Sequence, residues 1–380
     1  MLAMANKKII IVTISDLVEE ANLHRKARTL VENGYRVEIF AAWCGPLDPD
    51  LWRGIKLVRR KIRFKPMALR FVEFFLKALG YVFFRRADLF IAYDVYPMGA
   101  LRIKSMFTSC RYIYDSVELF PDIQALQGKP LRSKFWKMYE RFGIRGARAA
   151  FTVCRSDARV VQHRYPFLPD VPFVRNVPVF RPIPRSDYLR KEYDVPEDSK
   201  IGIYQGKVFA GRGLRPLIRA VAEVPGITLF IVGDGPLKPE LKKLAAELKA
   251  ADRVIFIDAV PFDRLQRFTA GADIGFTLIS GKGLSYYHAL PNKLFEYIQA
   301  GLPVIGSNYP EIRAVIEEDG IGYAVDPEDH QAIKHALEEM LKEENYRTFR
   351  SKLEKVRQKY TWQKESAGYL QIIRSALDEN

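Results

Sequence analysis

Short apolar runs alternate along the chain with longer stretches of helical period. At the start, Lys7–Ile14 is an apolar run, Leu17–Asn33 has a helical period that ends at Gly34, and Tyr35–Ala42 is again apolar. Short apolar runs are typical of buried parallel strands, and the order strand, helix, strand forms a βαβ unit. The pattern therefore predicts an α/β fold that opens with a Rossmann-like sheet.

The same alternation continues through the first half and restarts in the second. Strands are predicted at Lys56–Ile62, Asp88–Asp94, Arg111–Asp115, Ala149–Cys154, Ile201–Gln205, Thr228–Val232, Val254–Ile257, Ala272–Phe276 and Gly320–Val325. Residues 178–200 hold four prolines among charged residues and have no clear period, which is typical of an interdomain linker. We therefore predict two domains, 1–177 and 201–361, and 380 residues of which 48% are hydrophobic suffice for two cores.

One stretch of the second half predicts a short capped helix that leads into a buried strand. Pro291 suits the first helical position and Gly301 suits the end of the helix. The start of a helix attracts anions, and here Lys293 lies in the first turn. Glu296, one turn further, can accept hydrogen bonds from a vicinal diol, so the group suits a nucleotide diphosphate. Taken alone, Lys293 could equally be a solvated lysine. Taken alone, Glu296 could equally be an ordinary glutamate near the start of a helix.

A glycine-rich turn follows the first strand of the second half. It runs from Gly206 to Gly213 and includes Lys207 and Arg212. Glycines after a strand let the backbone approach a phosphate, and the two cations would neutralise it. The alternative is an exposed basic turn, which is a common surface feature.

A net charge of +15 predicts an anionic partner, which could be a membrane, a nucleic acid or an anionic substrate. The stretch Arg53–Arg86 holds 11 basic residues and one acid, Glu73. Within it, Met67–Phe84 predicts a helix that is apolar on most sides, as in a buried crossover helix or one at a membrane interface. Three charges and Gly80 argue against a spanning helix.

Cysteine content and the first apolar run predict a cytosolic protein. Cys44, Cys110 and Cys154 are an odd number without CxxC spacing, which favours reduced thiols. The run Ile9–Ile14 is too short for a signal peptide core or a membrane span, so we expect no export.

The stretch from Leu290 to Gly301 resembles the donor-binding helix of GT-B glycosyltransferases of family 4, in the subgroup with a P-N-K-L-F-E-Y string. In that family the glutamate matching Glu296 holds the donor ribose. The resemblance implies a donor site formed by Gly206, Lys207, Arg212, His288, Pro291, Asn292, Lys293, Leu294 and Glu296. Relatives more often carry arginine first and lysine second in the glycine-rich turn. They carry a second glutamate where this chain has His288, so we expect His288 to contact the donor sugar.

A second resemblance lies in the first half, where Tyr114–Pro121 looks like the family's Y-D-S-H-E-L-F-P segment. Val117 replaces a histidine thought to touch the transferring sugar, and valine neither donates a hydrogen bond nor carries a proton. Asp115 and Glu118 remain as candidate catalytic acceptors, with capping of a strand end or helix start as the alternative. The family also implies that the last helix, 362–380, packs back on the first domain.

The resemblance implies a GT-B architecture with two Rossmann-like domains facing across a cleft, and a hexosyltransferase that retains the anomeric configuration. The donor would be a nucleotide diphosphate sugar, and the acceptor a glycan or lipid-linked hydroxyl of cell-surface glycan or glycolipid assembly. Lys207, Arg212 and the amides of 291–294 would stabilise the leaving diphosphate. No cofactor or metal is expected, and Asp48-Pro49-Asp50, which matches a metal motif by letter, is expected to be a surface turn.

Three alternatives remain open. A catalytically silent GT-B protein that binds a sugar nucleotide or a partner would explain Val117 and His288, and a sugar-nucleotide epimerase is a weaker rival. A nucleic-acid partner is not expected, because no recognition module is visible. The protein is expected in the cytoplasm, docked peripherally on the inner face of an anionic membrane through Arg53–Arg86.

Overall fold

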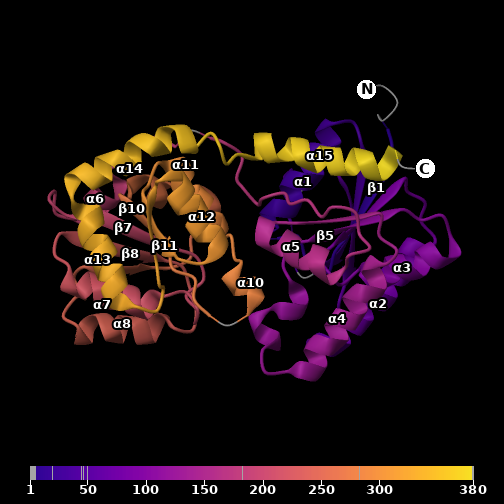
Figure 1. The fold of residues 1–380 in the computed structure, drawn as a ribbon, viewed down its shortest axis with the longest axis horizontal. Helices are drawn as coiled ribbons and strands as arrows, with labels where there is room; N and C mark the ends of the chain where they lie inside the picture. The colour runs from indigo at the N-terminus through magenta and orange to yellow at the C-terminus, as the bar shows by residue number, and fades with distance from the viewer. Residues whose placement is uncertain are drawn as a thin grey trace. The chain divides into compact units, whose positions relative to one another are not determined.

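The computed structural model describes residues 6–18, 20–43, 45, 47–48, 50–181, 183–281 and 283–378. They form two compact units (Figure 1). Unit 1 comprises Met1–Arg175 with Glu365–Asn380, and unit 2 comprises Asn176–Lys364.

The sheet of unit 1 has six parallel strands in the order β3-β2-β1-β4-β5-β6. The strands are β1 (Lys8–Val12), β2 (Arg36–Trp43), β3 (Lys56–Lys61), β4 (Leu89–Tyr93), β5 (Tyr112–Ser116) and β6 (Ala149–Thr152). Central strands are apolar without alternation because helices cover both faces. The predicted Rossmann-like first domain is confirmed.

Six α-helices belong wholly or mainly to unit 1. They are α1 (Ala21–Glu32), α2 (Met67–Phe83), α3 (Met98–Phe107), α4 (Pro130–Ile144), α5 (Arg155–Arg164) and α15 (Trp362–Asp378), with the 3₁₀ turns η2 (Phe120–Asp122) and η3 (Gln124–Leu126). From Glu365 onward, α15 packs on unit 1, where Tyr369 lies 5.9 Å from the ring of Phe151. In α2 only Phe74, Ala78 and Val82 are buried, so this helix is a crossover helix with a second face left exposed.

Unit 2 repeats the architecture, with six parallel strands in the order β12-β11-β10-β7-β8-β9. The strands are β7 (Lys200–Gln205), β8 (Ile227–Val232), β9 (Val254–Ile257), β10 (Ile274–Thr277), β11 (Val304–Ser307) and β12 (Gly322–Val325). The helices are α6 (Tyr188–Glu192), α7 (Leu214–Glu223), α8 (Lys238–Glu247), α9 (Phe262–Gly271), α10 (Leu284–Tyr287), α11 (Asn292–Ala300), α12 (Pro310–Asp319), α13 (His330–Leu341) and α14 (Glu343–Val356). In both units the strand order reverses beside the first strand, and in such sheets ligands bind at the carboxyl ends of the strands at that point.

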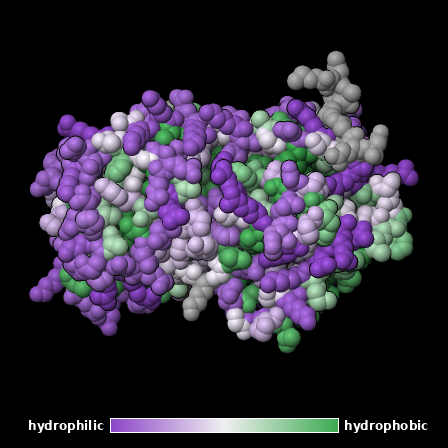
Figure 2. Space-filling view, viewed as in Figure 1, coloured by the Kyte–Doolittle hydropathy of each residue, from purple (hydrophilic) through white to green (hydrophobic). Residues whose placement is uncertain are grey.

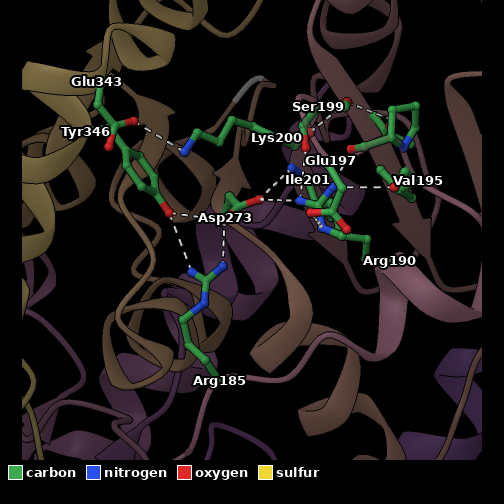
Figure 3. A network of polar contacts seen from close by, with 12 residues as sticks. Arg185, Arg190, Val195, Glu197, Ser199, Lys200, Ile201, Asp273, Glu343 and Tyr346 are labelled. Atoms are coloured by element: carbon green, nitrogen blue, oxygen red, sulfur yellow. Dashed lines mark hydrogen bonds and ion pairs between the residues drawn. The ribbon is translucent and has the colours of Figure 1, made fainter.

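The segment 178–200, which was predicted to be a linker, is part of unit 2 and is joined to its sheet by a polar network centred on Asp273 (Figure 3). One carboxylate oxygen accepts hydrogen bonds from Arg185, at 2.6 Å, and from the Tyr346 hydroxyl of α14, at 3.1 Å. The other accepts from the backbone N–H of Ile201, at 2.8 Å. The segment includes α6, and Leu189 is fully buried in the unit 2 core. This network lies at the amino end of β7 and β10, away from their carboxyl ends.

Close backbone contacts fix the elements that surround the carboxyl end of β7. A Cβ atom on Gly275 of β10 would lie 2.4 Å from the Tyr297 ring of α11, so glycine lets α11 pack directly on the strand. Gly233 has φ of +147°, and a Cβ there would lie 2.0 Å from the carbonyl oxygen of Gly206. The turns after β7 and β8 are therefore held against each other.

None of the helices within the described ranges is long and apolar enough to cross a membrane. Cys110 and Cys154 are free cysteines, whereas Cys44 lies outside the described residues.

Candidate functional site

The start of α11 lies at the carboxyl edge of the unit 2 sheet. Pro291 is extended, with ψ of 143°, so the helix begins at Asn292, one residue later than predicted. The Pro291 carbonyl accepts the first hydrogen bond of the helix, from the Leu294 N–H at 3.1 Å. Gly301 is left-handed, with φ of 73°, and ends the helix as predicted. The amides of Asn292 and Lys293 therefore form the positive end of the helix.

The glycine-rich turn after β7 meets α11 at Gly206. Gly206 has φ of +122°, and a Cβ there would lie 3.3 Å from Lys293 Nζ. The same ammonium lies 3.8 Å from the centroid of the Tyr204 ring. A side chain at position 206 would therefore be strained and would crowd the lysine, and glycine leaves room beside a cation.

Positive charge accumulates here. Burial and the neighbouring Arg212 guanidinium lower the pKa of Lys293 to about 7, against the opposing pull of Glu296. Arg212 lies 5.5 Å from the centroid of the Tyr286 ring and lines a cavity of about 250 Å³ with Gly213 and Ser280. Lys207 is exposed on the same turn, where its carbonyl accepts a bond from the Tyr204 hydroxyl at 2.8 Å. Because a nearby like charge disfavours the charged form of Lys293, an anion bound beside the two cations would stabilise it.

Glu296 is held by a neighbour that the sequence analysis missed. The Gln205 side-chain amide donates a hydrogen bond to the Glu296 carboxylate, and the Thr269 hydroxyl donates to Gln205 Oε1 at 2.7 Å. Gln205 is the last residue of β7 and is 3% exposed. The signal in the sequence was an amide side chain, that of Gln205, at the end of a predicted apolar strand. This chain of bonds fixes the carboxylate near the start of α11.

His288 directly follows a short helix, α10. Its backbone N–H donates to the Leu284 carbonyl at 2.8 Å, and its ring lies 5.6 Å from that of Tyr287. The side chain is 9% exposed, so it is largely packed within unit 2.

The structure thus brings together Gly206, Arg212, Lys293 and Glu296 and places Lys207 on the same turn. Pro291, Asn292 and Leu294 form the start of the adjoining helix.

In unit 1 the two predicted acidic residues occupy different environments. Asp115 is 1% exposed, and both its oxygens bind Lys26 Nζ, at 2.7 and 2.8 Å. That ammonium lies between aromatic rings, 4.9 Å from the centroid of Phe151 and 5.6 Å from that of Tyr93. Asp115 is therefore part of a buried ion pair that joins α1 to β5.

Glu118 instead lines a cavity of about 450 Å³ at the carboxyl edge of the unit 1 sheet, together with Val117 and Asp94. Burial raises the pKa of Glu118, and Asp157 adds to this effect. Burial and then Glu118 raise the pKa of Asp94 well above its usual value. Asp94 has φ of 71°, which is uncommon for a residue other than glycine, and sequence reasoning missed it. This cavity can offer two carboxyl groups of raised pKa as hydrogen-bonding partners to the hydroxyls of a ligand.

Asp48 and Asp50 lie on the surface, and the Asp48 carboxylate accepts a bond from the Asp50 N–H at 3.0 Å, as in a turn. Pro49 lies outside the described residues. Within the described ranges no group of three or more His, Cys, Asp or Glu side chains is placed to hold a metal ion.

Comparison with known proteins finds similarity to glycosyltransferases, which is strongest in unit 2. Residues 186–358 match the model of "Glycosyl transferases group 1", which covers most of unit 2. The chain is 29% identical over 159 residues to the lipopolysaccharide core biosynthesis glycosyltransferase LpsE of Rhizobium meliloti, covering 42% of this chain and 44% of that protein. It is 30% identical over 170 residues to the GDP-mannose-dependent alpha-(1-6)-phosphatidylinositol monomannoside mannosyltransferase of Mycobacterium tuberculosis, covering 43% of each. The chain thus matches less than half the length of these curated relatives.

The likeness in structure extends further than the likeness in sequence. The crystal structure of Anabaena Alr3699/HepE in complex with UDP superposes with a TM-score of 0.78 at 14% identity, over 97% of this chain and 100% of that one. The two Rossmann-like units are therefore those of the GT-B fold of glycosyltransferases, as the sequence predicted.

Proposed function

We propose that this protein is a retaining glycosyltransferase, which moves a hexose from a nucleotide diphosphate sugar to an acceptor hydroxyl. One observation carries the proposal: Lys293, Arg212 and the glycine-rich turn converge with Glu296 at the start of α11, within the segment that matches group 1 glycosyl transferases. The HepE structure with UDP, in the same fold, agrees with a nucleotide diphosphate as ligand.

Each residue has a chemical task in the proposed reaction. The bond between the sugar and the diphosphate breaks, and the diphosphate leaves with the electron pair. Arg212, Lys207, Lys293 and the first amides of α11 stabilise the charge that develops on it. Glu296 accepts hydrogen bonds from the ribose hydroxyls. The acceptor oxygen bonds to the sugar carbon from the same face that the diphosphate leaves, which retains the anomeric configuration without a protein nucleophile. The proton of the acceptor hydroxyl passes to an oxygen of the leaving diphosphate.

We propose that transfer requires no metal or cofactor, because the cations of unit 2 neutralise the diphosphate. Neutralisation by Arg and Lys can replace the role of a bound divalent ion. On this proposal, a chelator leaves the rate unchanged.

We propose that the acceptor hydroxyl belongs to a glycan or lipid-linked sugar of cell-surface or glycolipid assembly. Both curated relatives act in such pathways by name, one on lipopolysaccharide core and one on a phosphatidylinositol mannoside. The unit 1 cavity with Glu118 and Asp94 would accept its hydroxyls, while Asp115 stays in the ion pair with Lys26. The protein would work in the cytoplasm, at the inner face of the membrane.

A catalytically silent binder is the second candidate, and Val117 is the observation that favours it. Val117 lines the unit 1 cavity where relatives of the resembled family carry a histidine. Release of nucleotide diphosphate from a panel of nucleotide sugars, with total membrane glycolipid as acceptor, separates the two. A transferase releases nucleotide in an acceptor-dependent way, whereas a silent protein binds the donor and releases none.

A further inference from the structure

Helix α4 carries an apolar stripe on the side that faces away from unit 1. The stripe recurs at every third or fourth residue, and its exposed fractions are Leu131 83%, Phe135 49%, Met138 63% and Phe142 40%. The opposite side of the helix is buried, with Trp136, Glu140 and Ile144. An amphipathic helix normally buries its one apolar stripe. Much of the outer stripe of α4 therefore stays exposed on unit 1, although the Phe135 ring still contacts Phe71 and Tyr139.

Helix α2 repeats this arrangement beside α4. Besides Met67 at its start, four exposed apolar residues of α2 recur at spacings of three, four and seven residues, and they are Leu69 49%, Val72 50%, Leu76 61% and Phe83 38%. Phe71 of α2 joins the two helices, because its ring lies 4.9 Å from that of Trp136 and 6.3 Å from that of Phe135. We call these eight exposed apolar residues of α2 and α4 the α2–α4 face. Figure 2 shows hydrophobic residues among hydrophilic ones in the region where Figure 1 labels α4.

The α2–α4 face is bordered by positive charge. The exposed charged residues of α4 are all basic: Arg132, Lys134, Lys137 and Arg141. Its one acid, Glu140, is fully buried and accepts a bond from the Tyr165 hydroxyl at 2.6 Å. Among the described residues, no carboxylate lies within 4 Å of Lys134 or Arg141. Lys134, Lys137 and Arg141 line a cavity of about 490 Å³ beside Met138.

We propose that the α2–α4 face docks unit 1 on an anionic lipid bilayer. Apolar side chains on one helix face, bordered by lysine and arginine, enter the acyl boundary while the cations reach lipid phosphates. The basic residues of α4 favour an anionic partner. The exposed apolar residues favour a lipid bilayer over a soluble polyanion. This deepens the proposed lipid-proximal acceptor, but the docking itself does not depend on transfer activity.

The α2–α4 face shares helix α2 with the basic stretch Arg53–Arg86 that the sequence indicated, and it adds helix α4. Part of that charge is already used within unit 1: Arg59 donates to the carbonyl of Gly45 at 2.7 Å, and Lys77 pairs with Glu73 at 2.5 Å. The structure shifts the expected contact toward α4, which lies outside that stretch.

Sedimentation with vesicles tests the docking. Wild-type protein is mixed with vesicles of phosphatidylcholine alone and of phosphatidylcholine with phosphatidylglycerol, at low and high salt. We expect binding only to the anionic vesicles, and loss of binding with added salt. The charge variant Lys134→Gln/Arg141→Gln should lower the vesicle partition coefficient about tenfold. The stripe variant Leu131→Ser/Met138→Ser should lower it by at least as much, because apolar contact is lost.

The matched control is Lys243→Gln/Lys355→Gln, which removes the same charge from exposed positions of unit 2 and should bind like wild type. Melting temperature and nucleotide binding in unit 2 confirm that each variant is folded. The proposal is overturned if wild type ignores anionic vesicles, or if the control loses binding as strongly as the α4 variants. It is also overturned if the wild-type protein is a dimer and the stripe variant becomes a monomer without any change in vesicle binding. The face would then be a contact between two copies of this chain. Loss of vesicle binding with intact nucleotide binding keeps this test separate from that of the transferase proposal.

Discussion

Lys293 lies where the features of the candidate donor site meet. Its ammonium packs on the Tyr204 ring, lies beside Gly206 and is close enough to Arg212 for the two charges to oppose each other. With a pKa of about 7, the Lys293 side chain is neutral in about half of the molecules near pH 7. A bound diphosphate would restore the charge, because opposite charge nearby favours the protonated form.

Binding of a nucleotide diphosphate should therefore take up a proton. Below about pH 7 Lys293 is already charged and affinity should be constant. Above pH 7 affinity should fall, by up to tenfold per pH unit, until the raised pKa of the complex is reached. Lys293→Arg should remove this fall, since arginine stays charged. Titration calorimetry between pH 6 and 9 measures the affinity of wild type and of Lys293→Arg. Identical pH profiles for these two proteins would contradict the placement of Lys293 beside the bound diphosphate.

Gln205 is a positioning residue in this account, because it reaches the ligand only through Glu296. Gln205→Met keeps the size of the side chain but removes the amide. We expect nucleotide diphosphate binding to weaken by about 1 kcal/mol, the value of one hydrogen bond. Inorganic pyrophosphate, which has no ribose, should bind the variant like wild type. Equal losses for both ligands would indicate general damage to the site instead of a role through Glu296.

At the scale of elements, the sequence predicted most strands because buried parallel strands are short apolar runs between turn residues. It could not predict α10 or α6, since helices of four and five residues carry no readable period. It missed the contact of Gln205 with Glu296, because the two residues are 91 positions apart and only the packing of α11 on the sheet brings them together. It assigned Asp115 and Glu118 to one role, although Asp115 lies within β5 in a buried ion pair and Glu118 follows the strand and lines a cavity.

The Asp273 network should stabilise unit 2 by joining 178–200, β7 and α14 (Figure 3). Asp273→Ala leaves the Ile201 N–H and the Arg185 guanidinium without this acceptor. We expect a loss of about 2–3 kcal/mol in the free energy of unfolding, as for hydrogen bonds to a buried charged group. Urea denaturation measures it. Exposed Asp252→Ala is the control and should change stability by less than about 0.5 kcal/mol. A variant at position 273 as stable as that control would show that the network adds nothing.

At the scale of the whole molecule, two units of the same strand order carry different surfaces. Unit 2 holds the convergent cations and Glu296, and unit 1 holds the cavity with Asp94 and Glu118 and the α2–α4 face. The proposed nucleotide site and the proposed lipid-docking face thus lie on separate units. We therefore expect that a variant can lose one kind of binding and keep the other.

The central claim is that the start of α11 and the glycine-rich turn bind a nucleotide diphosphate, and calorimetric titration with UDP, GDP, ADP and dTDP tests it most directly. Wild type should bind at least one of them saturably. Glu296→Ala should weaken that binding through the ribose and Lys207→Ala through the phosphates, each by about 1.5–3 kcal/mol, or roughly 10- to 150-fold. The Lys243→Gln/Lys355→Gln protein should bind like wild type. If no nucleotide binds, or if both site variants remain folded and bind with wild-type affinity, the donor site lies elsewhere and the account is contradicted.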